Sequence, residues 1–236
     1  MIDLYSFPSP NVRKIVIALE ELGLAYRWVW TDIGAGDQFS DAFRAVNPNS
    51  KVPAIVDHDG PGGRPIALFE SAAILLYLSE KAGGALLPTD PARRWDAMCW
   101  LAWQVANHGP MAGQAVHFLR YAPSQGVHDE YAQDRYGREI ERLYAMLDER
   151  LADREYLVDE FSLADIACFP WVRLADGHGV DVSVHPHVAA WSARIAARPS
   201  ARVRIPDPRK EDPTVSGWSA EQFATLFRSD AGKATR

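Results

Sequence analysis

The sequence has few cysteines, and their placement excludes several classes of protein. Only Cys99 and Cys168 occur among the 236 residues. Two cysteines so far apart neither build a disulfide framework nor offer the spacing of a zinc site. Thiol-disulfide proteins carry a C-x-x-C pair where a first strand meets a helix, but here FPSPNVRK (7–14) holds no sulfur. This turn is therefore either an ordinary one or a redox site whose thiol comes from another molecule.

Other features that the sequence lacks limit the possible partners and the cellular location of the protein. The net charge is −6 and no basic stripe is present, which argues against a nucleic-acid partner. The longest strongly apolar run, AAILLYL (72–78), is too short to span a membrane. No basic segment precedes an apolar core at the start, so we expect no signal peptide there. The histidines lack metal-ligand spacing, so we expect no metal. Together these features predict a cytoplasmic protein without a membrane partner.

In the first third of the chain, segments with the residue pattern of β-strands alternate with segments whose apolar residues recur at helical spacing. Residues 2–7 and 26–30 are rich in strand formers, and a helical apolar face beginning at Val12 lies between them. This order predicts a β-α-β unit with parallel strands and a right-handed crossover. Two further strands at 52–57 and 65–70, joined by a Gly- and Pro-rich turn, should follow a short helix around residues 40–45. A largely buried helix is predicted at 71–81.

A Pro- and Gly-rich break at 83–94 is the best candidate linker. Beyond it strand signals almost vanish, and apolar residues recur at helical spacing. We therefore predict an α/β domain at residues 1–83, an all-helical domain at 92–205 and a polar, proline-rich tail at 206–236. The tail should end in a short helix around 219–228.

Two dipeptides have both a structural and a functional interpretation. Proline after Val52 most simply marks a strand start. A cis bond before Pro53, the less favoured alternative, would leave the Val52 backbone free to pair with an extended peptide. Ser71 is most simply a helix cap. Alternatively, Glu70 and the helix N-terminus at Ser71 hold the two charged groups of an α-amino acid.

Three further features have an even plainer structural interpretation. Gln38 and Lys51 are either solvated loop residues or ligands of a second carboxylate. SLAD (162–165) matches a capping box, with a hydrophobic staple around it, and we expect a structural role. Cys99 and Cys168 both lie in apolar helical patterns and should be buried, inert thiols.

Several motifs together resemble a cytosolic glutathione transferase from residue 1 to about 205. They are NPNSKVPAIVD, FESAAILLYL and FSLADIACFPW. Further phrases, SPNVRKI, GDQF, WQVANHGPMAGQAVHF and RYGREIERLY, are similar to the bacterial Nu-class glutathione-dependent disulfide-bond oxidoreductases. The resemblance implies a thioredoxin-like α/β domain followed by an all-α domain, glutathione as co-substrate, and a homodimer.

The resemblance also implies roles for single residues. Ser9, where the family often has Thr, and Asn11 lie near the glutathione sulfur, so the reactive thiol belongs to the ligand. The other implied glutathione contacts are Val52 beside Pro53 at the cysteinyl backbone, Glu70 and Ser71 at the γ-glutamyl end, Gln38, Arg135 across a dimer interface, and more weakly Lys51.

Three functions remain open at this point. The leading one is disulfide reduction by a bound glutathione thiolate. The second is conjugation of glutathione to an electrophile, which uses the same thiolate. The third is a non-catalytic binding or regulatory protein, because a fold does not by itself imply an activity.

Overall fold

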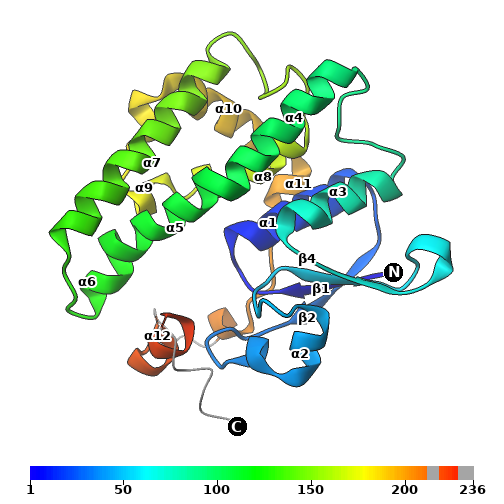
Figure 1. Ribbon diagram of the computed structural model, residues 1–236, viewed down its shortest axis with the longest axis horizontal. Coiled ribbons are helices and arrows are strands. Elements are labelled where there is room, and N and C mark those ends of the chain that lie inside the picture. The colour runs from blue at the N-terminus through cyan, green and yellow to red at the C-terminus, as the bar shows by residue number, and fades with distance from the viewer. Residues whose placement is uncertain (212–217, 228–236) are drawn as a thin grey trace. The chain divides into compact units, whose positions relative to one another are not determined.

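The computed structural model describes residues 1–211 and 218–227 (Figure 1). Contacts divide the chain into two units. The first contains Met1–Leu75 and Val203–Arg236, and the second contains Leu76–Arg202. Because contact-based units do not test what folds by itself, the domain boundaries at residues 83, 92 and 205 stay predictions.

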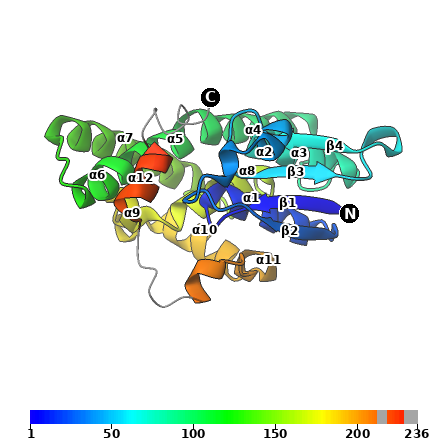
Figure 2. The same cartoon turned by 90° about the horizontal axis from the view of Figure 1, so that it is seen from below.

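The first unit is built on a four-stranded mixed sheet (Figures 1 and 2). Its strands are β1 (Ile2–Ser6), β2 (Tyr26–Trp30), β3 (Ala54–Asp57) and β4 (Ile66–Phe69), in the order β2-β1-β3-β4. β1 pairs with β2 in parallel, as predicted, while β3 is antiparallel to both β1 and β4. The predicted strands are therefore all present, within two residues at each end.

Among the described residues, four α-helices belong wholly or partly to this unit: α1 (Pro10–Glu21), α2 (Asp41–Val46), the start of α3 (Ser71–Lys81), and α12 (Ala220–Phe227). The apolar face predicted for α1 is buried, with Val12, Ile15 and Leu19 all inaccessible to solvent. The tail helix predicted at 219–228 is confirmed as α12. The local periodicity was sufficient for α1 and α12 because each has a clear apolar face.

The described residues of the second unit contain helices and loops but no β-ladder. After the end of α3 come α4 (Pro91–Trp103), α5 (Gly109–Val116), α6 (Ala122–Ser124), α7 (Glu130–Leu151), α8 (Leu163–Val172), α9 (Ala175–His178), α10 (Pro186–Ala196) and α11 (Pro199–Arg202). α5 and α7 lie side by side in Figure 1. Among the described residues, no helix has the length and apolar character needed to cross a membrane.

The long stretch from α4 to α6 contains two π-helical turns that the sequence pattern did not predict. They lie at Gln104–His108 and His117–Tyr121. Pro110 and Pro123 each follow one turn closely. A proline inside a helix lacks an N–H and clashes with the carbonyl four residues earlier. Here those carbonyls belong to residues 106 and 119, inside the two turns, so the wider π geometry accommodates each proline.

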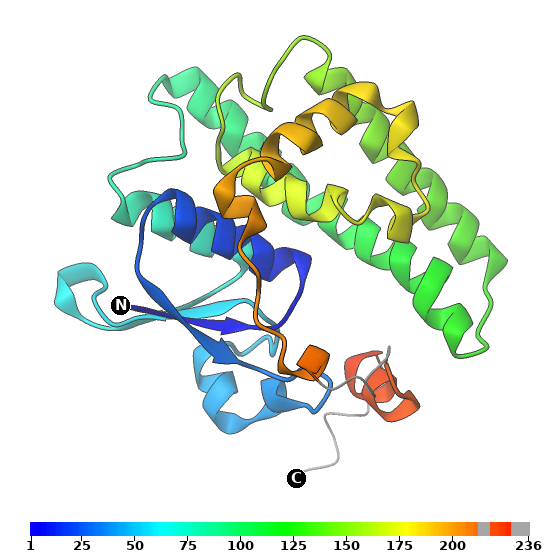
Figure 3. The same cartoon turned by 180° about the vertical axis from the view of Figure 1, so that it is seen from behind.

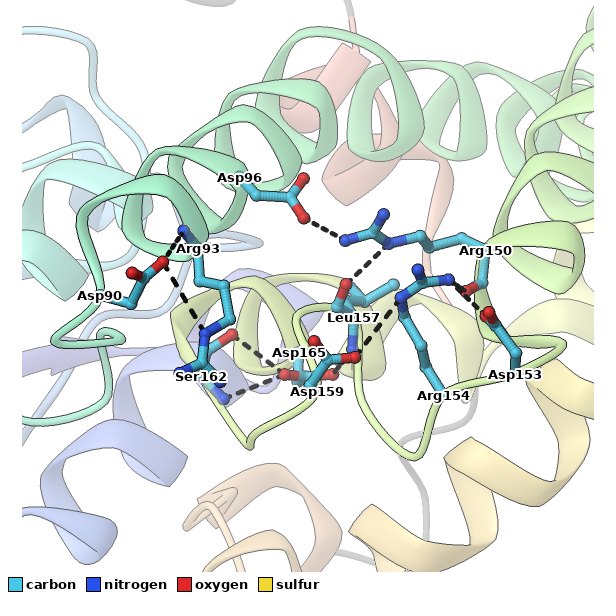
Figure 4. Close-up of polar contacts among 10 residues, drawn as sticks. All are labelled: Asp90, Arg93, Asp96, Arg150, Asp153, Arg154, Leu157, Asp159, Ser162 and Asp165. Atoms are coloured by element: carbon cyan, nitrogen blue, oxygen red, sulfur yellow. Dashed lines mark hydrogen bonds and ion pairs between the residues drawn. The ribbon is translucent and has the colours of Figure 1, made fainter.

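The predicted capping box is confirmed at the start of α8 (Figure 4). The Asp165 carboxylate accepts hydrogen bonds from the Ser162 amide at 3.0 Å, the Ser162 hydroxyl at 3.1 Å and the Leu157 amide at 3.0 Å. Trp191 Nε1 donates a fourth at 2.8 Å. Burial raises the pKa of Asp165 to about 6 despite these donors, so the group is ionised at neutral pH.

One cysteine prediction is wrong. Cys168 is buried in α8 as expected, but Cys99 on α4 is exposed. The buried residues of α4 are Ala97, Trp100 and Leu101. Because successive helical residues are rotated by roughly 100°, Cys99 lies on the opposite side from the 97/101 ridge. The apolar neighbours in sequence therefore gave a misleading expectation of burial.

His178 gives the second unit a pH-dependent stability. Its ring is buried, Nδ1 lies 3.3 Å from the Tyr144 hydroxyl, and burial lowers its pKa to about 4. In the unfolded chain His178 takes up a proton near pH 6.5, whereas in the folded chain it does so only near pH 4. The free energy of unfolding therefore falls as the pH drops from about 6.5 to about 4.

Over this pH range we expect the free energy of unfolding of the parent to fall by about 3 kcal/mol more than that of His178→Gln, measured by urea unfolding. Comparing the two proteins at each pH cancels the contribution of Asp165. Parallel curves for parent and variant would contradict this assignment.

Candidate functional site

The turn between β1 and α1 carries the two residues predicted to face a thiol. Ser9 is extended, and its Oγ accepts a hydrogen bond from the Val12 amide at 3.3 Å. Ser9 is therefore the N-cap, and Asn11 lies inside the first turn of α1. The Ser9 hydroxyl hydrogen remains available to donate, and the helix N-terminus favours a negative charge beside it.

The bond between Val52 and Pro53 is cis. The favoured interpretation of this dipeptide as a simple strand start is therefore incomplete, although β3 does begin at the next residue. The Asn47 side chain holds the preceding segment by donating to the Lys51 carbonyl at 2.6 Å. Among the hydrogen bonds between described residues, none uses the Val52 amide or carbonyl. This backbone is available to pair with an extended peptide.

Glu70 and Ser71 meet where β4 passes into α3. Glu70 has a φ of 66°, an unusual left-handed conformation for a residue other than glycine. Ser71 is the first residue of α3, so the expected cap role is wrong. Its Oγ instead accepts a hydrogen bond from Lys14 Nζ at 3.3 Å. The first amides of α3 have no partner within the helix, and they suit a carboxylate.

Lys14 is the residue that the sequence interpretation missed. It lies on α1, and its side chain is almost completely buried. A signal was present, because Lys14 interrupts a helix whose neighbours Ile15 to Leu19 are all buried. Lys14 directly precedes this run on the same helix, whereas the charged residues Arg13 and Glu20 of α1 are not buried. Its buried ammonium beside Ser71 places a positive charge next to the N-terminus of α3.

Gln38 is not the solvated loop residue of the simpler interpretation. It is only 4% exposed, and its Nε2 donates to the Ile33 carbonyl at 3.0 Å. Its Oε1 is buried without a partner among the described residues. A buried acceptor without a partner is unusual in a folded protein, so Gln38 is a candidate for a functional role. The Lys51 side chain is exposed.

Sheet register brings the other candidates of the first unit to one edge. Tyr5 pairs with Ala54, and Ala54 pairs with Phe69. The turn after β1, the cis bond before β3 and the Glu70–Ser71 step after β4 therefore leave the sheet at the same end. The Thr31 amide donates to the Ser6 carbonyl at 3.1 Å, which brings the loop toward Gln38 to this end as well. A short extended ligand along this edge would meet all four segments.

Arg135 is far from these residues in the sequence and belongs to the second unit. It is on α7, its side chain is exposed, and its Nη1 lies 3.9 Å from a Glu139 carboxylate oxygen. Its role across a dimer interface stays a prediction. Within the described ranges 1–211 and 218–227, no group of three or more His, Cys, Asp or Glu side chains is arranged to hold a metal ion.

Comparisons with known proteins agree with this architecture. Two family models match: the glutathione S-transferase N-terminal domain at residues 8–81 and the C-terminal domain at residues 109–199. Disulfide-bond oxidoreductase YfcG of Escherichia coli is 46% identical over 85% of this chain and 92% of its own length. A Pseudomonas putida glutathione transferase, solved with one glutathione disulfide per subunit, has a TM-score of 0.80 at 42% identity, covering 85% of this chain and 88% of that one. A Pseudomonas fluorescens family member, solved with two glutathiones, has a TM-score of 0.79 at 40% identity, covering 85% and 90%. These matches confirm the predicted fold class.

Proposed function

Because the chain belongs to the glutathione S-transferase family and is an enzyme of that type, we propose that it reduces disulfides with a bound glutathione thiolate. The observation that carries the proposal is the sheet edge where Ser9, Asn11, Val52, Glu70 and Ser71 converge. No cysteine lies at this edge, since Cys99 and Cys168 are on helices of the second unit. The relative named as a disulfide-bond oxidoreductase and the structure with bound glutathione disulfide support the same conclusion.

Glutathione would bind as an extended tripeptide along the edge. Its cysteinyl backbone pairs with Val52, as in other cases where a peptide adds to a free strand edge. Its γ-glutamyl carboxylate accepts from Ser71 and the first amides of α3, and Glu70 balances its ammonium. Gln38 Oε1 accepts a hydrogen bond from the ligand. The cysteinyl sulfur then lies near the Ser9 hydroxyl and the N-terminus of α1, both of which favour the thiolate.

The reaction balances with two glutathiones. The bound thiolate attacks one sulfur of a disulfide, which forms a mixed disulfide with glutathione and expels the other sulfur as a thiolate. A second glutathione thiolate attacks the glutathione sulfur of the mixed disulfide, releasing the remaining substrate thiolate and glutathione disulfide. The two protons given up by the glutathione thiols go to the two leaving thiolates.

Two variants test this assignment. The Cys99→Ala/Cys168→Ala double variant should keep activity within about twofold, because the reacting sulfur belongs to the ligand. Asn11→Ala should lose most of it, at least about tenfold, because a donor beside the thiolate is removed. The assay is 2-hydroxyethyl disulfide reduction with glutathione, and thermal melting of each variant checks folding. An inactive but folded double cysteine variant would refute the mechanism.

The same experiment ranks the alternatives. A model aryl halide assayed in parallel measures conjugation, and a faster rate with the halide than with the disulfide would favour a conjugating transferase. Titration calorimetry with glutathione addresses the non-catalytic alternative. No heat of binding from folded protein would favour a regulatory protein on this fold.

We further propose that the chain forms a homodimer of the Nu-class type, in which Arg135 reaches the glutathione of the partner subunit. The Arg135 side chain is 57% exposed, and its ion pair with Glu139 is long, at 3.9 Å. Such an arginine is free to reorient toward a carboxylate. A cytoplasmic location stays our prediction, since that compartment maintains the reduced glutathione that the reaction consumes.

A further inference from the structure

The C-terminal segment, meaning here the described residues 203–211 and 218–227, belongs to the same unit as the sheet. Figure 3 shows it in orange and red beside the end of β2. The matched family domains end at residue 199, before this segment begins. Its contacts nevertheless gather around the turn that carries Ser9 and Asn11.

Arg209 makes the first attachment. Its guanidinium lies 4.2 Å from the centre of the Phe7 ring, 5.2 Å from that of Trp218 and 6.0 Å from that of Trp30. The buried carboxylate of Asp207 accepts two hydrogen bonds from it, at 3.0 and 3.1 Å. A planar guanidinium suits stacking and a paired carboxylate together, which an ammonium does not. Phe7, the ring closest to it, precedes Ser9 by two residues.

Arg13 makes a second attachment on the other side of the turn. Its guanidinium donates to the backbone carbonyl of Val203, at the start of the C-terminal segment. Phe7 and Arg13 therefore bracket Ser9, Pro10 and Asn11, and both are tied to the same segment. The first turn of α1 is fixed from both ends by residues that are about 190 or more positions away in sequence.

Trp218 makes a third attachment. Its ring stacks on Phe7 with centroids 5.8 Å apart. It also lies against Gly34, where an added Cβ would come within 2.9 Å of the indole. Gly34 follows Ile33, whose carbonyl accepts from Gln38. The C-terminal segment thus contacts two of the loops that form the candidate glutathione site.

We propose that the C-terminal segment contributes to the function of the glutathione site. Arg209 is a positioning residue that holds the Phe7–Asn11 turn next to the thiolate. This inference rests on the proposed function. Arg209 is expected to act indirectly, because its guanidinium already contacts three rings and the Asp207 carboxylate. Its effect should fall on the reactivity of the sulfur, because hydrogen bonds and helix-dipole effects depend steeply on the position of the donor. Glutathione affinity depends mainly on the contacts at Val52, Glu70 and Ser71.

The test compares Arg209→Lys, Arg209→Ala and Trp218→Ala with Arg204→Ala, a control at an exposed arginine of the same segment. In each full-length protein we would measure kcat and KM for glutathione with 2-hydroxyethyl disulfide. The pKa of the bound thiol would be read from thiolate absorbance. Hydrogen exchange at the Val12 and Arg13 amides would be measured without ligand. Both amides bond to Ser9, so they report directly on the turn.

Both Arg209 variants should lower kcat at least about fivefold and raise the thiol pKa, with KM changed less than about twofold. Trp218→Ala should behave similarly, and Arg204→Ala should match the parent. Amide exchange should be faster in the three test variants. Kinetics and exchange equal to those of Arg204→Ala would overturn the proposal, as would a rise in KM at constant kcat. If even the parent lacks turnover, the proposed function fails, and the exchange data alone decide whether the segment holds the turn.

Discussion

Asp165→Ala should lower the free energy of unfolding by at least about 3 kcal/mol, the largest stability effect expected of a single polar substitution here. The carboxylate is completely buried and accepts four hydrogen bonds. Those from Leu157 and Ser162 are drawn in Figure 4, and the fourth comes from Trp191. Alanine would leave those donors without an acceptor in a place that water does not reach. A buried donor without a partner costs about 1–3 kcal/mol. These bonds join the loop at Leu157, the start of α8 and Trp191 on α10, so one change would loosen three segments.

The measurement is urea unfolding at pH 7, where the carboxylate is ionised. Asp165→Asn should also be destabilised, because one acceptor oxygen becomes an NH₂ group facing other donors. Asp134→Ala is the matched control, since Asp134 is exposed and its ion pair with Arg138 on α7 is a surface pair. Such pairs contribute about 0–1 kcal/mol. If Asp165→Ala and Asp134→Ala unfold at similar urea concentrations, the central role assigned to Asp165 is wrong.

The sequence alone was sufficient to predict those elements whose determining interactions are local. The strands, α1, α3 and the capping box each depend on residues within a few positions, and periodicity or spacing predicts them. The parallel pairing of β1 and β2 followed from the handedness of crossovers. The convergence of Val52 and Glu70 on one sheet edge required the pairing register, which no single segment specifies.

Long-range contacts explain what the sequence could not provide. Lys14 and Ser71 are 57 positions apart, so neither segment alone predicts their hydrogen bond. Gln38 lies in a polar stretch that gives no local indication of the burial of its side chain. The prediction that Cys99 is buried was wrong for the opposite reason, because its apolar neighbours lie on another face of α4. In each case the local pattern was ambiguous, and tertiary contacts decided the outcome.

The second large effect is expected at Lys14, the site residue that sequence alone missed. Its Nζ donates to Ser71 Oγ, which leaves the Ser71 hydroxyl hydrogen free to point toward a ligand. The ammonium also adds positive charge beside the amides that would bind the γ-glutamyl carboxylate. Lys14→Met keeps a similar length and removes both effects. Hydrogen bonds involving charged groups contribute about 1.5–3 kcal/mol, so glutathione binding should weaken by a factor of about 10 to 150.

Titration calorimetry of parent and variant gives the two dissociation constants, and Lys81→Met serves as control because Lys81 is an exposed lysine of α3. The ligand supplies a second control. Cysteinylglycine lacks the γ-glutamyl group, so parent and Lys14→Met should bind it with equal, weak affinity if Lys14 acts through that carboxylate. Equal weakening for both ligands would mean that Lys14 supports the fold of the whole edge. Unchanged affinity for glutathione would show that the γ-glutamyl end does not bind at Ser71, and the proposed orientation of the tripeptide would have to be reversed.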